Sequence, residues 1–274
     1  MTDLAVAAQR ADSFRALHRP AQPLLLPNPW DAGSARVLAS LGFAALATTS
    51  SGFAATFGRP DGAVSGDEAL AGAVAIAAAV DLPVTADLEN GYADQPDGVA
   101  ATVTAAAQAG LAGCSIEDYS GRADSLYDAA QAADRIAAAA HAAHAGQVRL
   151  VLTARAENYL RGHADLADTI ARLQRYQEAG ADVLYAPGLT RAADIRAVIS
   201  SVDLPVNVLA MPAAPPVAEL AELGVARISV GGSFAFAALD ALAEAARELQ
   251  AGTFTGYAKR AAAGRAIAAT AFGG

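Results

Sequence analysis

The feature of this sequence that most limits its fold is a regular alternation of short β-like runs with longer, alanine-rich helical patterns. Eight apolar runs of strand length occur along the 274 residues, and each is followed by a stretch with helical spacing. Eight such units are what a closed barrel of parallel strands requires. The runs are residues 23–26, 44–48, 84–88, 114–117, 149–153, 183–185, 206–209 and 227–230.

Glycines follow several of the helical patterns at the position where a left-handed C-cap is expected. No Pro- or Ser-rich linker divides the chain, so we expect one domain, residues 1–274, with a helical tail from about residue 253. An open, doubly wound sheet is the rival arrangement, but no G-x-G-x-x-G segment follows the first strand. The pattern therefore predicts an α/β fold, a (β/α)8 TIM barrel. The capping glycines are Gly42, Gly110, Gly146, Gly180 and Gly224.

Composition narrows the class of partner. The net charge of −9 argues against binding to nucleic acid or to an anionic membrane. The longest uncharged apolar stretch, residues 69–80, falls short of the roughly 20 residues that span a bilayer. The single cysteine, Cys114, excludes an internal disulfide and multi-cysteine metal sites, and no secretory signal pattern begins the chain. We expect a cytoplasmic protein that binds a small molecule.

Carboxylates follow two neighbouring strands of the predicted barrel, whereas the strand starts have no comparable polar residues. Asp87 and Glu89 stand at positions i and i+2, and Glu117 ends the next run. Side chains alternate along a strand, so the three acids are expected to converge on one barrel mouth. Three like charges need a cation, and Mg²⁺ prefers oxygen ligands. The alternative is that these acids are helix N-caps or solvated loop residues.

Five motifs give the chain a family resemblance over about residues 24–232. TTSSGFAATFGRPDG, TADLENGYAD, SIEDYSG, LTARAENYLRG and PVNVLA resemble, in order and spacing, the isocitrate lyase/phosphoenolpyruvate mutase superfamily. The resemblance implies a (β/α)8 barrel in a homo-oligomer, tetramer or dimer, whose additional C-terminal helix is swapped between subunits. It also implies Mg²⁺, with Mn²⁺ as a substitute, holding a 2-oxo acid or phosphonate while a bond at C3 is made or broken.

The resemblance also implies metal and catalytic roles for individual residues. Asp87 matches the direct metal ligand of the family, with Glu89 and Glu117 around the metal through water. Arg155 matches the active-site arginine, and Asp61 matches an aspartate near the metal and the substrate. The planar guanidinium of Arg155 suits a carboxylate or phosphonate, although a structural salt bridge to a neighbouring glutamate is its alternative.

Four further positions match the substrate-binding residues of the family. Thr49, Ser50 and Ser51 match the turn that binds the substrate carboxylate through backbone N–H and hydroxyl groups. Asn207 matches a polar residue that contacts the substrate.

The sequence departs from the carbon–carbon lyases of the superfamily. Those enzymes have a Lys/Arg-Cys-Gly-His segment after the fourth strand, whose cysteine protonates the enolate. Here the stretch is EDYSGRADSLYDAAQ, without Cys or His. Cys114 lies three residues before Glu117, so it should face a helix. The second acid is also Glu89 where many relatives have Asp. The chain thus resembles the phosphoenolpyruvate mutase-like branch without the cysteine loop, which disfavours isocitrate and methylisocitrate lyase activity.

These observations predict a Mg²⁺-dependent lyase or hydrolase that acts at C3 of a short 2-oxo acid through a pyruvate enolate. Oxaloacetate decarboxylation comes first, because it needs enolate stabilisation but no cysteine acid. Phosphonopyruvate hydrolysis and phosphoenolpyruvate phosphonomutation remain alternatives. A pseudoenzyme that binds a 2-oxo acid without turnover is the alternative from another class.

Overall fold

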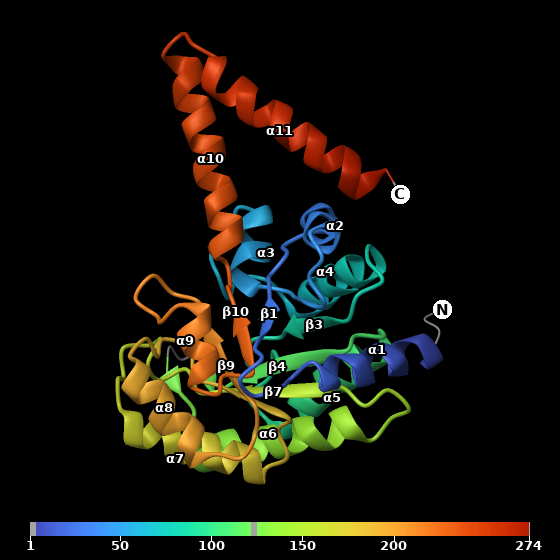
Figure 1. The fold of residues 1–274 in the computed structure, drawn as a ribbon. Coiled ribbons are helices and arrows are strands. Elements are labelled where there is room, and N and C mark those ends of the chain that lie inside the picture. Colours follow the sequence, from blue (N-terminus) through green and yellow to red (C-terminus); the bar gives the residue numbers. More distant parts are fainter. Residues whose placement is uncertain (1–3, 122–124, 274) are drawn as a thin grey trace.

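The computed structural model describes residues 4–121 and 125–273, and in them eight parallel strands form one sheet. The strand order is β1-β10-β9-β8-β7-β4-β3-β2. The two end strands meet, because the Ala47 N–H donates to the Pro27 carbonyl at 3.1 Å. The predicted (β/α)8 barrel is therefore confirmed, as a nearly closed barrel (Figure 1). Its strands are β1 (Leu24–Leu26), β2 (Leu46–Ala47), β3 (Val84–Asp87), β4 (Gly113–Glu117), β7 (Val151–Arg155), β8 (Val183–Tyr185), β9 (Val206–Leu209) and β10 (Arg227–Ser229).

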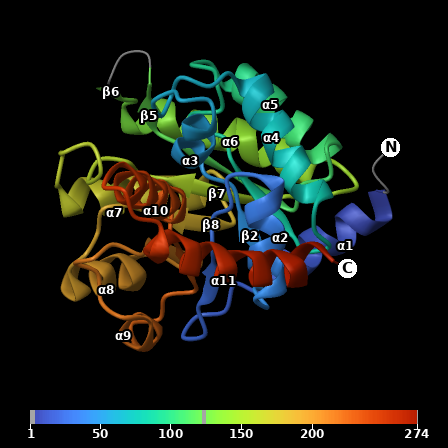
Figure 2. The same ribbon diagram turned by 90° about the horizontal axis from the view of Figure 1, so that it is seen from above.

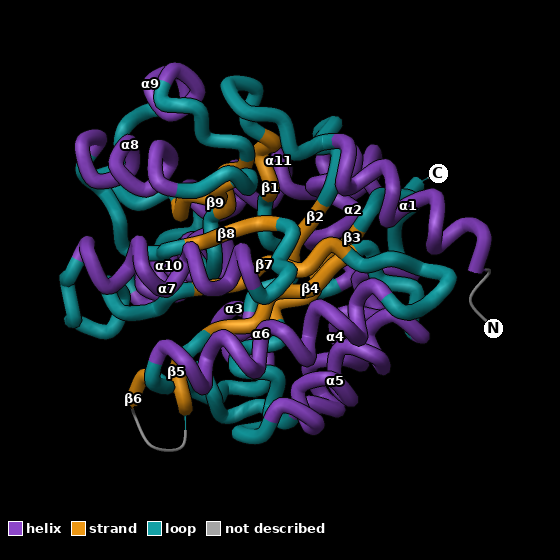
Figure 3. The backbone as a smooth tube through the Cα atoms, turned by 90° about the horizontal axis from the view of Figure 1, so that it is seen from below, coloured by secondary structure: helices purple, strands orange, loops and turns teal. Residues whose placement is uncertain are grey.

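Helices surround the barrel, and a small hairpin lies beside it. Figures 2 and 3 show the helices outside the strands. The hairpin consists of β5 (Tyr119–Ser120) and β6 (Ser125–Leu126), which pair antiparallel. The helices are α1 (Leu4–Ala16), α2 (Ala32–Ser40), α3 (Ser50–Thr56), α4 (Gly66–Ala78), α5 (Pro96–Gln108), α6 (Ala129–His144), α7 (Leu166–Glu178), α8 (Ala192–Ser201), α9 (Val217–Glu222), α10 (Ser233–Gln250) and α11 (Thr255–Phe272).

Helix ends follow the glycine pattern with one exception. Gly42, Gly110, Gly180 and Gly224 have φ between 81° and 97°, where a side chain would be strained. Gly146 was expected to do the same, but it is not in the left-handed region. The chain instead leaves α6 through a bend in which Leu150 N–H donates to the Ala143 carbonyl.

The apolar core lies between the barrel and its helices, whereas polar residues occupy part of the barrel interior. Along β4, Cys114 and Ile116 are fully buried in the apolar core, and the alternate residue Ser115 lines a cavity inside the barrel. The side chain of Cys114 thus faces away from the barrel mouth, as its spacing from Glu117 predicted.

The two C-terminal helices extend beyond the barrel. Figure 1 shows α10 rising away from it and α11 returning toward α2, against which α11 packs. The predicted helical tail is thus present, but α11 buries none of its described residues. Large apolar side chains are exposed on α10, including Phe236, Leu239 and Leu242. In the described ranges, no helix is both long and apolar enough to span a bilayer.

Candidate active site

Two neighbouring cavities open among the carboxyl-terminal ends of the strands. The barrel cavity, of about 160 Å³, is lined by Asp87, Tyr185 and Asn207 among other residues. The side cavity, of about 230 Å³, is lined by Glu89, Glu117 and Arg161 among others. Both cavities include Ser50, Asp61, Leu160 and Arg155 in their walls. Each of the nine residues expected from sequence to form the site lines at least one of the two cavities. They are Thr49, Ser50, Ser51, Asp61, Asp87, Glu89, Glu117, Arg155 and Asn207.

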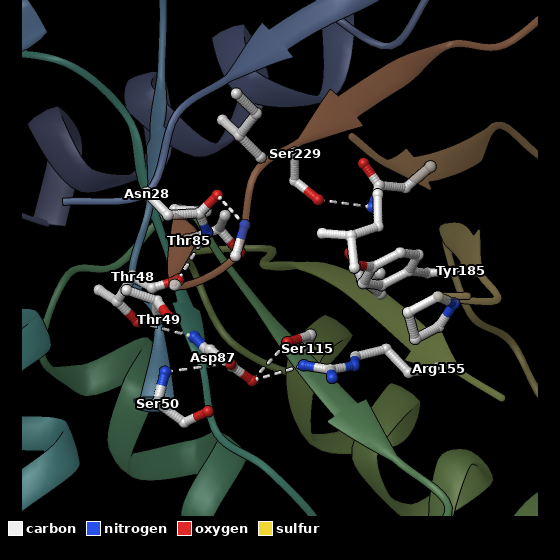
Figure 4. A pocket seen from close by; sticks show the side chains of 18 of the residues that line it. Asn28, Thr48, Thr49, Ser50, Thr85, Asp87, Ser115, Arg155, Tyr185 and Ser229 are labelled. Carbon is white, nitrogen blue, oxygen red and sulfur yellow. Dashed lines mark hydrogen bonds and ion pairs between the residues drawn. The ribbon is translucent and has the colours of Figure 1, made fainter. Parts of the chain in front are cut away.

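The turn after β2 brings its hydroxyl groups and backbone to Asp87. Thr49 is the N-cap of α3, and its Oγ1 accepts a hydrogen bond from the Gly52 N–H. This cap directs the first turn of α3 into the barrel mouth, where the Ser50 N–H donates to Asp87 Oδ2 at 3.2 Å. Thr48 Oγ1 accepts from the Asp87 N–H at 2.9 Å. The end of β3 and the turn are therefore fixed together (Figure 4).

Arg155, the last residue of β7, is the centre of a carboxylate cluster. Its guanidinium donates to Asp87 at 2.8 Å, Glu117 at 3.0 Å and Glu157 at 2.9 Å. Burial opposes the charge of Arg155, but these carboxylates raise its pKa well above the ordinary value. Burial also disfavours charged carboxylates and so raises the pKa of Glu117 and of Glu157, whereas the shared guanidinium of Arg155 acts to lower both values. The salt bridge considered from sequence is thus present, and it includes two of the three predicted metal ligands, Asp87 and Glu117.

A second network fixes the chain beside this cluster. Asp118 is buried and accepts hydrogen bonds from Tyr176 Oη at 2.6 Å and from Arg172 Nη1 at 3.0 Å. Its other oxygen accepts from the Glu157 N–H at 2.8 Å. Because Asp118 follows Glu117 and binds the backbone of Glu157, it sets the spacing between the two glutamates that contact Arg155.

Glu89 does not extend β3 as expected. The strand ends at Asp87, and Glu89 has a left-handed backbone with φ 47°. Its carboxylate therefore lines the side cavity, not the barrel cavity, and Tyr92 Oη donates to it at 3.3 Å. Burial, followed by the charges of Asp87 and Asp61, raises the pKa of Glu89 to about 7. The three acids thus lie around one barrel mouth but line two cavities, with Asp87 in the barrel cavity and Glu89 and Glu117 in the side cavity.

Asp61 and Asn207 lie at opposite depths of the site. Asp61 is exposed, on the loop between α3 and α4, and lines both cavities. Asn207 on β9 is 1% exposed, and its amide donates to Ser229 Oγ at 2.9 Å. Figure 4 shows Ser229 and Tyr185 on the far side of the pocket from Asp87. The guanidinium of Arg155 lies 5.3 Å from the centre of the Tyr185 ring.

Sequence reasoning missed the polar residues inside the barrel. Ser115, Thr153 and Arg227 all line the barrel cavity, although they precede the strand ends. Arg227 is the first residue of β10, where no functional polar residue was expected. The available signal was alternation, because Ser115 and Thr153 each stand two residues before a predicted site residue, Glu117 and Arg155.

The donor chemistry of the cluster fits a hard divalent cation. In the described parts of the chain, no group of three His, Cys, Asp or Glu residues is arranged to hold a metal together. A Mg²⁺ site that uses one direct carboxylate and several waters does not require such a group. Around the two cavities, five carboxylates face three guanidinium groups, those of Arg155, Arg161 and Arg227. This excess negative charge is what a cation would neutralise. The acids are Asp61, Asp87, Glu89, Glu117 and Glu157.

Fold and site together define a (β/α)8 barrel with an ion-paired carboxylate cluster at the carboxyl-terminal mouth of its strands. The sequence model of the phosphoenolpyruvate phosphomutase family matches residues 14–250. The chain therefore belongs to this family, within the isocitrate lyase/phosphoenolpyruvate mutase superfamily that the motifs indicated.

Individual relatives differ in activity. A crystal structure of a candidate lyase/mutase from Burkholderia cenocepacia J2315 is 52% identical, covers 92% of this chain and 91% of that chain, and has a TM-score of 0.88. An oxaloacetate decarboxylase of Pseudomonas paraeruginosa is 31% identical over 247 residues, which are 86% of this chain and 83% of the relative. A phosphonopyruvate hydrolase in complex with oxalate and Mg²⁺ is 25% identical, covers 90% of this chain and 89% of that chain, and has a TM-score of 0.79.

Proposed function

We propose that this protein is a Mg²⁺-dependent enzyme that acts at C3 of a short 2-oxo acid through a pyruvate enolate, with oxaloacetate decarboxylation as the first candidate reaction. The observation that supports it best is the contact of Arg155 with Asp87 and Glu117 beside the Ser50 N–H. The guanidinium of Arg155, the hydrogen-bonded carboxylate of Asp87 and the N–H of Ser50 meet there, at the ends of parallel strands. The similarity to an oxaloacetate decarboxylase over most of the chain supports the same reaction.

The proposed chemistry assigns distinct tasks to the residues of the mouth. In decarboxylation the C3–C4 bond breaks, its electron pair enters the enolate, CO₂ leaves, and C3 later gains a proton. Negative charge therefore grows on the oxygen at C2, where an enclosed guanidinium is most effective. We assign this task to Arg155, the substrate carboxylate to the turn at residues 49–51, and metal binding to Asp87. Bound Mg²⁺ would supply further positive charge to the oxygens of the 2-oxo acid.

Cysteine acid chemistry has no place in this proposal. Cys114 is the one cysteine of the chain, and it is 0% exposed in the apolar core. Burial raises the pKa of its thiol to about 12. A thiol enclosed in this core cannot reach an enolate at the barrel mouth.

Phosphorus–carbon chemistry is the second candidate activity. The similarity to a phosphonopyruvate hydrolase over most of the chain favours it, and the enolate that leaves is the same. Hydrolysis would yield pyruvate and phosphate, and phosphonomutation would yield phosphoenolpyruvate. A protein that binds the 2-oxo acid without turnover would keep the cluster but release neither product.

A homo-oligomer belongs to the same proposal. The helix α10, which rises away from the barrel, exposes Phe236, Leu239 and Leu242, and α11 has no buried residue among those described. Exposure of such an apolar surface to water is unfavourable, and surfaces of this kind mark interaction sites. We propose that a second copy of this chain covers it, in line with the swapped C-terminal helix that the superfamily resemblance implies.

A substrate panel tests the proposed activity. The protein is incubated with Mg²⁺ and either oxaloacetate, phosphonopyruvate or phosphoenolpyruvate, and pyruvate, phosphate and phosphonate are measured. Pyruvate with CO₂ from oxaloacetate, above the spontaneous rate, supports decarboxylation. Phosphate release or interconversion of the phosphorus compounds supports the second candidate. Oxalate binding without any product supports the pseudoenzyme, and neither binding nor turnover contradicts the proposal.

A further inference from the structure

Arg227 lies in the wall of the barrel cavity and has no part in the proposed chemistry described so far. It is 4% exposed. Strand register connects it with the active-site arginine, because Arg155 is opposite Tyr185, Tyr185 opposite Asn207, and Asn207 opposite Arg227. These four residues all line the barrel cavity. One row of paired positions across four neighbouring strands thus has a guanidinium at each end.

The hydrogen-bond partners of Arg227 are neutral. Its Nε donates to Asn207 Oδ1 at 3.0 Å and its Nη2 to Thr153 Oγ1 at 3.0 Å. Its Nη1 lies 3.2 Å from His18 Nε2. His18 Nδ1 lies 2.9 Å from the Phe14 carbonyl, which can only accept, so Nδ1 bears the proton and Nε2 accepts from Arg227.

The electrostatic surroundings of the two arginines therefore differ. Arg155 contacts three carboxylates, whereas Arg227 forms no ion pair with any carboxylate of the described residues. Burial lowers the pKa of Arg227 to about 10, and the charge of Arg155 contributes to this. An enclosed cation without a counter-ion is costly in a folded protein. An anion bound in the cavity would supply the missing negative charge.

Arg227 also fixes the orientation of the Asn207 amide. The Asn207 Oδ1 accepts from Arg227, so its Nδ2 must be the donor to Ser229 Oγ. An amide nitrogen has two hydrogens, and the bond to Ser229 uses one. The second N–H is then available to a ligand in the barrel cavity. The guanidinium of Arg227 thus orients the Asn207 amide so that it offers a ligand a hydrogen-bond donor, not an acceptor.

We propose that Arg227 is a positioning and specificity residue, whose uncompensated charge and hold on Asn207 select doubly charged anions over singly charged ones. This inference rests on the proposed function, because it assigns the anion to the same cavity. It adds to the proposed function the residue that discriminates between these two classes of anion.

Calorimetry with two ligands tests this selection. Oxalate, a dianion, and pyruvate, a monoanion, are titrated in the presence of Mg²⁺ into the wild type and into Arg227→Gln and Arg227→Lys. We expect Arg227→Gln to weaken oxalate binding by about 10-fold or more and pyruvate binding by less than about 3-fold. Arg227→Lys should recover most of the oxalate affinity. The control Arg10→Gln removes the same charge from an exposed pair with Asp81 and should change neither affinity.

Thermal unfolding separates this role from a structural one. Loss of an unpaired buried charge should leave the midpoint of Arg227→Gln unchanged or raise it. An Arg227→Gln protein whose ratio of oxalate to pyruvate affinity equals that of the wild type would overturn the inference. A lower midpoint together with equal losses of both affinities would show that the role of Arg227 is structural. If Arg227→Gln fails to fold, the ratio of oxalate to pyruvate affinity in Arg227→Lys is the deciding measurement. An Arg227→Lys protein that does not prefer oxalate over pyruvate would count against the inference. Absence of oxalate binding by the wild type would instead contradict the proposed function itself.

Discussion

Arg155 reaches across β4 to pair with Asp87, with 2.8 Å between Nη1 and Oδ1. The strands β3, β4 and β7 are neighbours, and Glu117 at the end of the middle strand contacts the same guanidinium at 3.0 Å. The guanidinium at the end of β7 therefore contacts carboxylates at the ends of β3 and β4, and so connects three adjacent strands. Its planar fork allows this, because separate N–H groups point at separate acids.

Arg155→Lys tests whether that fork serves catalysis or only binding. Lysine keeps the charge but cannot donate along three fixed directions. If the guanidinium stabilises the developing enolate, kcat should fall by roughly 10²-fold or more while KM changes less. Steady-state kinetics on the folded variant measure both constants. A higher KM with an unchanged kcat would limit Arg155 to anchoring the substrate, and wild-type values of both would remove it from the site.

Cys114→Ala tests the absence of thiol chemistry. The side chain is enclosed in the apolar core, so its removal should leave turnover within a few-fold of wild type and cost about 1 kcal/mol of stability. Kinetics and urea unfolding provide the two numbers. A folded variant with a loss of activity on the order of 10²-fold would bring the thiol back into the mechanism.

His18 should make stability depend on acid. Burial, together with the charge of Arg227, lowers the pKa of His18 to about 3, whereas an unfolded histidine titrates near 6.5. Between these values the unfolded chain binds the proton and the folded protein does not. The contribution of the neutral His18 to the free energy of unfolding is therefore complete above about pH 6.5. It falls as the pH drops, by about 1.4 kcal/mol per pH unit in this window. Urea unfolding from pH 8 to 4 should show this slope reduced in His18→Gln. Parallel curves for the two proteins would contradict the assignment.

Leu242→Asp tests the proposed oligomer. Leu242 is 66% exposed on α10, so a charge there should leave the barrel folded but disrupt an apolar contact with a second copy. Light scattering should show a smaller mass for this variant than for wild type. Gln250→Glu adds a charge to the same helix at an exposed polar position and should keep the wild-type mass. A wild-type protein that is already monomeric would refute the proposal.

Much of the fold could be predicted because its signals are local. Strand runs, helical spacing and the C-cap at Gly180 each depend on a few adjacent residues. The inward position of Glu117 and the core position of Cys114 follow from alternation within β4. The family motifs added roles for the site residues, each of which lines at least one of the two cavities.

The rest depended on contacts between distant segments. Alternation placed Glu89 beside Asp87, but the chain turns left-handed at Glu89 after the strand has ended. The sequence put Arg155 at the mouth, yet its pairing with Asp87 follows from the order of three strands. Arg227 was overlooked because strand starts were expected to be structural. With only three residues in β10, its first side chain still lines the cavity.

Oxalate titration of the wild type and of Asp87→Ala, with and without Mg²⁺, tests whether Asp87 holds the metal on which binding of the 2-oxo acid depends. We predict that the wild type binds oxalate only when Mg²⁺ is present, because one carboxylate at the end of β3 holds the metal. Asp87→Ala should lose this binding. Glu89→Gln should only weaken it, because Glu89 would contact the metal through water. Circular dichroism would verify that each variant is folded. An oxalate affinity in Asp87→Ala equal to that of the wild type would exclude Asp87 as the metal ligand.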